Sequence, residues 1–372
     1  MTPRTSPPFR ADHVGSLLRP RELTRARDEH AAGRLGTDEL RAVEDDAIRD
    51  VVRKQEAVGL QSATDGEFRR ATWHMDFIDS LGGITHAEER IKVEFHNEDG
   101  TISWEPTAMR VSERVTLKEP IFADHFAFLQ SCVTIATPKL TIPSPSMVHY
   151  RGGRAAIDDK VYPDLDDFWS DLTTAYADEV RALGDLGCTY LQFDDTSLAY
   201  LNDPKQRDFV TNTGGDPEHL HEDYIRHINE ALDGRPEGMA VTVHLCRGNF
   251  QSSWVAQGGY DYVAEALFND LAVDGFFLEY DDARSGGFEP LRFVPPGKYV
   301  VLGLVTTKRG DLESKDDLKR RIEEASRHVD VEQLCLSGQC GFSSTVEGNA
   351  LTEDEQWAKL ALIVETAREV WA

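Results

Sequence analysis

The sequence contains no apolar run close to the roughly 20 residues that a membrane-spanning helix needs. Its opening residues, MTPRTSPPFRADH, carry no apolar signal segment. Cysteine is scarce, and the 5 residues are Cys132, Cys188, Cys246, Cys335 and Cys340. An odd number at irregular spacing forms no disulfide framework and is typical of a reducing compartment. We therefore expect a soluble, cytoplasmic protein.

Positive charge is also in short supply. The 372 residues include 40 lysines and arginines against 66 aspartates and glutamates, a formal net charge of −26. Nucleic acids and anionic membranes attract proteins through clustered cations, so neither is an expected partner. The same charge weighs mildly against a polyanionic small substrate, although solubility alone explains an acidic surface.

Two nucleotide-binding signatures are missing, because no Gly-x-Gly-x-x-Gly follows the first expected strand and there is no P-loop. From Lys139 onward, short apolar runs alternate with amphipathic helical segments, a pattern typical of parallel strands joined by helical crossovers. The expected strands are centred on Val14, Ala63, Leu140, Leu191, Val241, Phe277, Leu302 and Leu334. About eight such strands predict an α/β protein, a single (β/α)8 TIM-type barrel domain over residues 1–372, with an open doubly wound sheet as the alternative.

The pattern changes between residues 90 and 115. Residues 91–95 and 101–104 alternate apolar and polar side chains around Asn97-Glu-Asp-Gly100, which is a hairpin signal. This segment is too short to bury a core of its own. We therefore expect a β-hairpin excursion from the barrel.

The residues that carry chemistry stand at the ends of expected strands, where parallel barrels gather their functional groups. His244 and Cys246 are two residues apart, so both side chains leave one face of a strand. Imidazole and thiolate suit zinc, and later strand ends add Glu279 and Cys340. The sequence thus predicts Zn²⁺ as cofactor, held by these four residues. Core packing is the alternative for any one of them alone, and it is the interpretation we keep for the other three cysteines.

A carboxylate among thiolates indicates a reactive site, because structural zinc sites are usually sealed by Cys and His while catalytic sites keep a replaceable position. Glu279 could yield to an incoming thiol, which the metal would hold as thiolate near neutral pH. Two cysteinate ligands leave the centre less Lewis acidic than an all-histidine site, so the bound sulfur stays nucleophilic. The ligand set predicts alkyl transfer to a thiol.

With these residues the sequence resembles the catalytic C-terminal barrel of cobalamin-independent methionine synthases. His244-Leu-Cys246, the Glu279 strand end and Gln339-Cys340-Gly341 match that family's zinc ligands in order and approximate spacing, and the similarity extends to residues 14–16, 64–67 and 191–194. The resemblance implies a zinc-dependent S-methyltransferase in which homocysteine, as zinc-bound thiolate, attacks a methyl donor to give methionine. The donor it implies is 5-methyltetrahydrofolate or a substitute.

The resemblance also implies how the acceptor is held. Ser16 would bind the carboxylate of homocysteine, and Glu67 and Asp194 its ammonium group. Lys308 falls near a histidine that the family uses as an acid. The expected catalytic residues are therefore Lys308 together with Glu279, the displaceable zinc ligand, and Asp194, which would bind the acceptor.

Other departures concern the donor. The tryptophan expected to stack on the folate is replaced around residues 147–150, and Asp194-Asp195-Thr196 stands where the family has Asp-Glu-Pro. Trp73 and His74 could line a donor pocket or simply pack a loop.

These departures keep alternatives open. One is a thiol alkyltransferase of the epoxyalkane:coenzyme M transferase type, whose sulfonate would need cations such as Arg19 or Arg69. Another is a lyase related to uroporphyrinogen decarboxylase, which shares the barrel and needs no His–Cys–Cys set. A protein that merely holds zinc would have a saturated site. In the favoured interpretation the partners are a small-molecule thiol and a methyl or alkyl donor.

Overall fold

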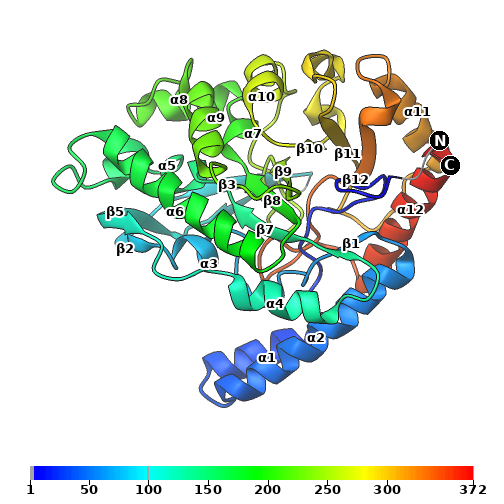
Figure 1. The fold of residues 1–372 in the computed structure, drawn as a ribbon, viewed down its shortest axis with the longest axis horizontal. Coiled ribbons are helices and arrows are strands. Elements are labelled where there is room, and N and C mark those ends of the chain that lie inside the picture. Colours follow the sequence, from blue (N-terminus) through cyan, green and yellow to red (C-terminus); the bar gives the residue numbers. More distant parts are fainter. Residues whose placement is uncertain (1–3, 99, 372) are drawn as a thin grey trace.

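The computed structural model describes residues 4–98 and 100–371. Its centre is a six-stranded sheet in the order β12-β11-β10-β9-β8-β7, with every neighbouring pair parallel. Helices surround this sheet (Figure 1), and the first described residues lie beside the last helix, where the Arg10 guanidinium lies 5.2 Å from the Trp371 ring. The predicted α/β class is confirmed.

The strands of this sheet are short and almost fully buried, as expected for strands covered by helices on the outside. Their bounds are β7 (Leu140–Pro143), β8 (Tyr190–Asp195), β9 (Ala240–Leu245), β10 (Gly275–Glu279), β11 (Tyr299–Val305) and β12 (Leu334–Gly338).

The longer helices carry one apolar face each, and that face packs toward the sheet or a neighbouring helix. They are α1 (Arg21–Ala31), α2 (Thr37–Val58), α4 (Ala123–Cys132), α6 (Leu165–Asp185), α8 (Pro204–Asn212), α9 (Leu220–Ala231), α10 (Ala264–Asp270), α11 (Lys315–Ala325) and α12 (Glu353–Trp371). Three single turns, α3 (Met75–Ile78), α5 (Ser146–His149) and α7 (Ser197–Tyr200), follow strand ends or loops, and four 3₁₀ turns lie at Gly153–Ala156, Ala283–Ser285, Glu289–Phe293 and Val331–Gln333. Among the described helices, none combines the length and apolar character that crossing a membrane requires.

Two of the expected strands are much shorter than the others. Residues 10–12 pair with β12 through one parallel bridge between Ala11 and Leu336, and β1 (Ser62–Ala63) pairs with β6 (Thr137–Pro138), just before β7. Side chains join these two short segments, because Ser62 Oγ donates to Asp12 and Thr64 Oγ1 donates to the Gly15 carbonyl at 2.6 Å. The backbone ladder is continuous only through β7–β12.

The expected excursion is larger than one hairpin. β3 (Val93–Asn97) and β4 (Gly100–Trp104) form the predicted antiparallel pair, and β2 (Gly82–Arg90) and β5 (Thr107–Thr116) extend it as a second pair. Most residues of β2 are exposed or half-buried and many are charged, so its alternation is too weak to predict a strand. The inner hairpin contacts the loop after β9, because His96 and Trp254 exchange backbone hydrogen bonds of 2.7 and 2.9 Å.

A buried ion pair lies under the first strands. Lys139 Nζ is 3.4 Å from Asp12 Oδ1, both side chains are inaccessible to solvent, and Lys139 also donates to the His13 carbonyl at 2.6 Å. Tyr190 Oη donates to the other oxygen of Asp12 at 2.8 Å. A buried charge needs such compensation, since removing one partner of a buried pair costs about 3–5 kcal/mol.

We therefore expect Lys139→Met to lower the free energy of unfolding by about 3–5 kcal/mol, because it leaves the Asp12 carboxylate buried without its cation. Urea denaturation followed by circular dichroism measures the change. Combining Lys139→Met with Asp12→Asn should recover part of the loss. A single Lys139→Met variant that unfolds at the wild-type urea concentration would contradict the expectation.

Candidate functional site

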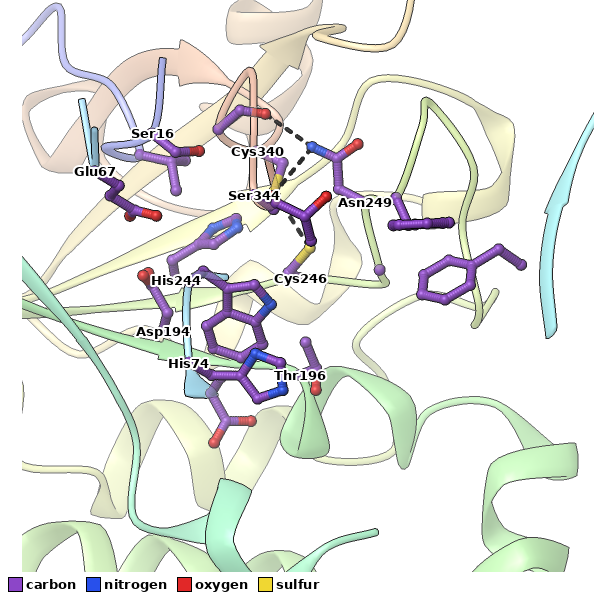
Figure 2. Close-up of a pocket in the computed structure, with 18 of the residues that line it drawn as sticks. Ser16, Glu67, His74, Asp194, Thr196, His244, Cys246, Asn249, Cys340 and Ser344 are labelled. Atoms are coloured by element: carbon purple, nitrogen blue, oxygen red, sulfur yellow. Dashed lines mark hydrogen bonds between the residues drawn. The ribbon is translucent and has the colours of Figure 1, made fainter. Parts of the chain in front are cut away.

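A pocket opens where the carboxyl ends of the sheet strands meet the β3–β4 hairpin. Its walls come from residues far apart in the chain, including Ser16, Glu67, Asp194, His244 and Cys340. Figure 2 shows Ser16 and Glu67 on one side of the two cysteines and Asn249 on the other. These five wall residues and Cys246 make six predicted site residues that line this pocket.

His244, Cys246 and Cys340 converge as predicted. One ligand atom from each lies within 4.8 Å of the other two, and all three residues are buried. The two sulfurs are 3.3 Å apart although the residues are 94 positions apart in the sequence. Neither ring nitrogen of His244 has a hydrogen-bond partner among the described residues. One imidazole and two thiols with free ligand atoms are a donor set that fits Zn²⁺.

A hydrogen bond joins the sulfurs of Cys246 and Cys340. The hydrogen bond between the sulfurs lowers the pKa of Cys340 well below its ordinary value, and His244 beside it acts in the same direction. The same contact raises the pKa of Cys246. A thiolate next to a thiol is ready to accept a cation, because metal binding needs deprotonated sulfur.

Glu279 is close to this group but is not part of it. Leu278 pairs with Leu245 in the sheet, which places Glu279 beside Cys246 at the strand ends. One carboxylate oxygen accepts a hydrogen bond from the Arg247 backbone N–H at 2.9 Å, and the other lies 3.2 Å from Lys308 Nζ. Burial opposes its charge, but Lys308, Arg247 and Arg284 lower the pKa of Glu279 to about 2.

Lys308 is not among the residues that line the pocket. It lies behind Glu279, with Nζ also 3.3 Å from Asp281. Burial works against its charge, but Asp281 and Glu279 outweigh that effect and raise the pKa of Lys308 above its ordinary value. The ammonium group is therefore a fixed cation between two carboxylates.

The three residues expected to hold the acceptor all line the pocket. Asp194 pairs with His244 in the sheet, and Gln192 donates to its carboxylate at 2.7 Å. Glu67 accepts from Thr141 at 2.9 Å, while its second oxygen has no partner among the described residues. Burial raises the pKa of Glu67 to about 7 and that of Asp194 to about 6. Two carboxylates that lack full compensation suit a cationic ligand.

Local backbone structure sets these positions. Glu67 has a left-handed backbone with φ of 60°, which costs about 1–3 kcal/mol for a non-glycine residue, and Asp65 stabilises the turn by accepting the Glu67 N–H at 2.9 Å. Ser16 lies against Gly341, where a Cβ atom would come 2.0 Å from the serine hydroxyl. Glycine after Cys340 is thus required for the two strand ends to approach.

Aromatic residues form the outer part of the pocket. Phe95, Trp104 and Phe250 pack together, with ring centroids 5.2 to 6.5 Å apart, and we call them the aromatic cluster. Trp73 stacks on His74 with centroids 4.4 Å apart, and both line the pocket. Phe95 and Trp104 come from the hairpin, so the excursion supplies one wall of the site.

Several candidate residues serve the fold instead. Arg19 donates to the carbonyls of Ser343, Thr345, Glu67 and Arg70, and Arg69 pairs with Asp45. Asp195 accepts the Leu198 N–H at 2.7 Å and the hydroxyls of Ser144, Ser146 and Ser197. Neither arginine is among the residues that line the pocket, where the sulfonate of a coenzyme M substrate would have to bind.

Sequence reasoning missed other lining residues: Arg151, Thr196, Tyr200, Asn249 and Ser344. Asn249 donates to the Gly341 carbonyl at 2.8 Å and ties the loop after β9 to the Cys340 turn. Of these five, only Thr196 falls in a motif, Asp194-Asp195-Thr196, where it marked a departure from the family and no role of its own. Only the position of Asn249, three residues after Cys246, could have indicated a role at the same strand end.

Comparison with known proteins identifies the family to which this chain is similar. Residues 9–369 match the family model of the cobalamin-independent synthase catalytic domain. The chain is 47% identical over 369 residues to the uncharacterized protein YxjG of Bacillus subtilis (strain 168), which covers 99% of this chain and 96% of that protein.

Solved structures agree. A Listeria monocytogenes protein, provisionally named a vitamin-B12-independent methionine synthase, superposes with a TM-score of 0.79 at 38% identity and covers 99% of both chains. The B12-independent methionine synthase of Shewanella sp. W3-18-1, solved in complex with selenomethionine, has the same fold, with a TM-score of 0.71 at 20% identity over 96% of both chains. This chain therefore belongs to the cobalamin-independent methionine synthase family, matching its catalytic domain.

Proposed function

We propose that this protein is a zinc-dependent methyltransferase that methylates the thiol of homocysteine and releases methionine. The observation that carries the proposal is the convergence of His244, Cys246 and Cys340 within 4.8 Å. The family match supports the reaction class. The methyl donor would be 5-methyltetrahydrofolate or a substitute.

His244, Cys246 and Cys340 would hold the zinc, with Glu279 as a fourth and displaceable ligand. Zinc bound there would supply the Lewis acidity that lowers the pKa of the acceptor thiol, so that the sulfur reacts as a thiolate. In the transfer a carbon–sulfur bond forms, the bond from the methyl group to the donor breaks, and the thiol proton ends on the leaving group.

The acceptor's amino-acid end would lie on the Ser16 side of the pocket. Glu67 and Asp194 would bind its ammonium group, since both are buried, incompletely compensated carboxylates. Ser16 would donate its hydroxyl to the carboxylate. These contacts orient the thiol toward the cysteine pair, which adjoins them in the same pocket.

We assign Lys308 a positioning role in place of proton donation. Its ammonium group contacts Glu279 and Asp281, and Lys308 is not among the residues that line the pocket. By contacting the Glu279 carboxylate, Lys308 would weaken its hold on the zinc, so that the acceptor sulfur could displace it. The thiol proton would then reach the leaving group without passing through Lys308.

A cytoplasmic location is part of this proposal. All 5 cysteines are free thiols, as a reducing compartment favours. The partners would be small molecules only, an amino-acid thiol and a methyl donor.

The direct test offers the zinc-loaded protein homocysteine together with 5-methyltetrahydrofolate, as monoglutamate and triglutamate, and identifies methionine by mass spectrometry. Cobalt in place of zinc gives a visible spectrum that reports thiol binding without turnover. We expect homocysteine to change that spectrum. A spectrum that no thiol alters would overturn the proposal.

Cys340→Ser should lose most of the bound zinc, because a neutral hydroxyl replaces a thiolate ligand. Metal analysis by mass spectrometry measures the loss, and circular dichroism checks that the fold remains. Cys132→Ser is the matched control, since Cys132 is a half-buried thiol at the end of α4 and should leave the zinc content unchanged. Full zinc occupancy in Cys340→Ser would show that the ligands are wrong.

The affinity for homocysteine should fall as the pH drops below about 7. Glu67 and Asp194 have raised pKa values, about 7 and about 6, so they carry their charges only above these values and lose their attraction for the ammonium group below them. Glu67→Gln should raise KM about 10- to 100-fold at pH 8, equivalent to losing a charged hydrogen bond of about 1.5–3 kcal/mol. The remaining pH dependence should move toward pH 6.

The control for this prediction is 4-mercaptobutyrate, which keeps the thiol and the carboxylate of homocysteine but has no ammonium group. Its binding to the cobalt form should not weaken in Glu67→Gln. An equal loss for both thiols would mean that Glu67 acts on the thiol or on the fold.

Lys308→Met should release the Glu279 carboxylate, which would then compete with the acceptor thiol. We expect the cobalt spectrum without thiol to change and the affinity for homocysteine to fall about tenfold, or ~1.4 kcal/mol. Lys308→Arg keeps the charge and should resemble the wild type. An unaltered spectrum and affinity in Lys308→Met would contradict the positioning role.

A further inference from the structure

Arg151 is an unpaired cation in the pocket. It lies in the turn between α5 and the 3₁₀ turn at Gly153–Ala156, and it is the one arginine or lysine among the described residues that line the pocket. It forms no hydrogen bond and no ion pair with any residue that the structure describes. Its guanidinium carbon lies 5.3 Å from the centroid of the Trp104 ring, and its charge also acts on Tyr150 and Tyr200.

Other buried arginines near the site donate hydrogen bonds to protein acceptors, whereas Arg151 donates to none among the described residues. Arg19 donates to four backbone carbonyls and to the Ser343 hydroxyl. The Arg247 side chain donates to the Gly258 carbonyl, the Tyr260 hydroxyl and the Glu279 carbonyl. A guanidinium has five N–H donors in a planar fork, so a half-buried one without acceptors has its binding capacity unused.

The residues around Arg151 differ from those proposed to bind the amino-acid end of the acceptor. Trp104 belongs to the aromatic cluster, with its ring centroid 6.0 Å from that of Phe250. His74 adds no second cation, because burial, and then the charge of Arg151, lower its pKa well below the ordinary value. This side of the pocket therefore combines flat apolar surfaces with one positive charge.

We propose that Arg151 binds an anionic group, a carboxylate or another oxyanion, on the methyl donor, while the donor's ring system packs on the aromatic cluster. Arg151 is thereby a specificity-determining residue for the donor. The guanidinium fork matches the two oxygens of a carboxylate, and such charge-assisted bonds are the strong ones. The chain has a net charge of −26, so this cation provides local attraction for an anionic donor inside the pocket.

This inference rests on the proposed methyl transfer, but its test needs neither zinc nor turnover. The probes are 4-aminobenzoate and 4-aminobenzamide, which share a ring and differ in charge. Binding is followed by tryptophan fluorescence, since Trp73 and Trp104 line the pocket. We expect the wild type to bind the anion about 10- to 100-fold more tightly than the amide, the equivalent of one charged hydrogen-bonded contact.

Arg151→Met should abolish this preference, and Arg151→Lys should retain part of it. Both variants should melt like the wild type, because Arg151 holds no other described residue by a hydrogen bond. Arg110→Met, a change at an exposed arginine of β5, is the matched control and should keep the full preference. Equal binding of both probes by the wild type, or a preference that survives in Arg151→Met, would overturn the proposal.

A second arm separates the donor from the acceptor. In the cobalt form of Arg151→Met, homocysteine should change the spectrum at the same concentration as in the wild type. Weaker homocysteine binding would show that Arg151 serves the acceptor carboxylate, and the donor assignment would be overturned. If instead no thiol binds while the preference for 4-aminobenzoate persists, the methyl transfer fails and the anion site remains.

Discussion

A charge taken out of water must be compensated by an opposite charge or by hydrogen bonds, and this requirement divides the buried charges of the protein into two groups. Asp12 and Lys139 are compensated by each other and by hydrogen bonds with Ser62, Tyr190 and the His13 carbonyl. In the pocket, Glu67 keeps an oxygen without a partner, and Arg151 has no ion pair among the described residues. Charges left incomplete by the fold are the ones that a ligand can complete.

The parallel sheet explains why fully compensated and incompletely compensated side chains lie close together. Parallel strands end at one edge, so β9 and β12 deliver His244, Cys246 and Cys340 to one point although they are separated along the chain. The backbone at the same edge also supplies donors, as the Arg247 N–H does for Glu279. A soft ligand set beside a carboxylate held by a lysine is therefore a product of strand register as much as of residue type.

The parts of this arrangement that depend on short-range pattern could be predicted from the sequence. Alternating strands and helices indicated the parallel sheet, Asn97 to Gly100 indicated the inner hairpin, and the His–x–Cys spacing indicated the converging ligands. The pairing of Glu279 with Lys308 could not be predicted, because it depends on how two strand ends face each other in three dimensions. Arg151 left no sequence signal, since an unpaired arginine differs from a paired one only in its neighbours.

The sheet edge and the hairpin excursion, β2–β5, supply different parts of the site. The two cysteine sulfurs lie just beyond the ends of β9 and β12, while Phe95 and Trp104 come from a ribbon whose His96 pairs with Trp254 in the loop after β9. Loops and excursions tolerate replacement far better than the strands that carry them. The ribbon is thus an exchangeable module: evolution or an engineer could change the aromatic wall of the pocket and leave the His–Cys–Cys group at the sheet edge untouched.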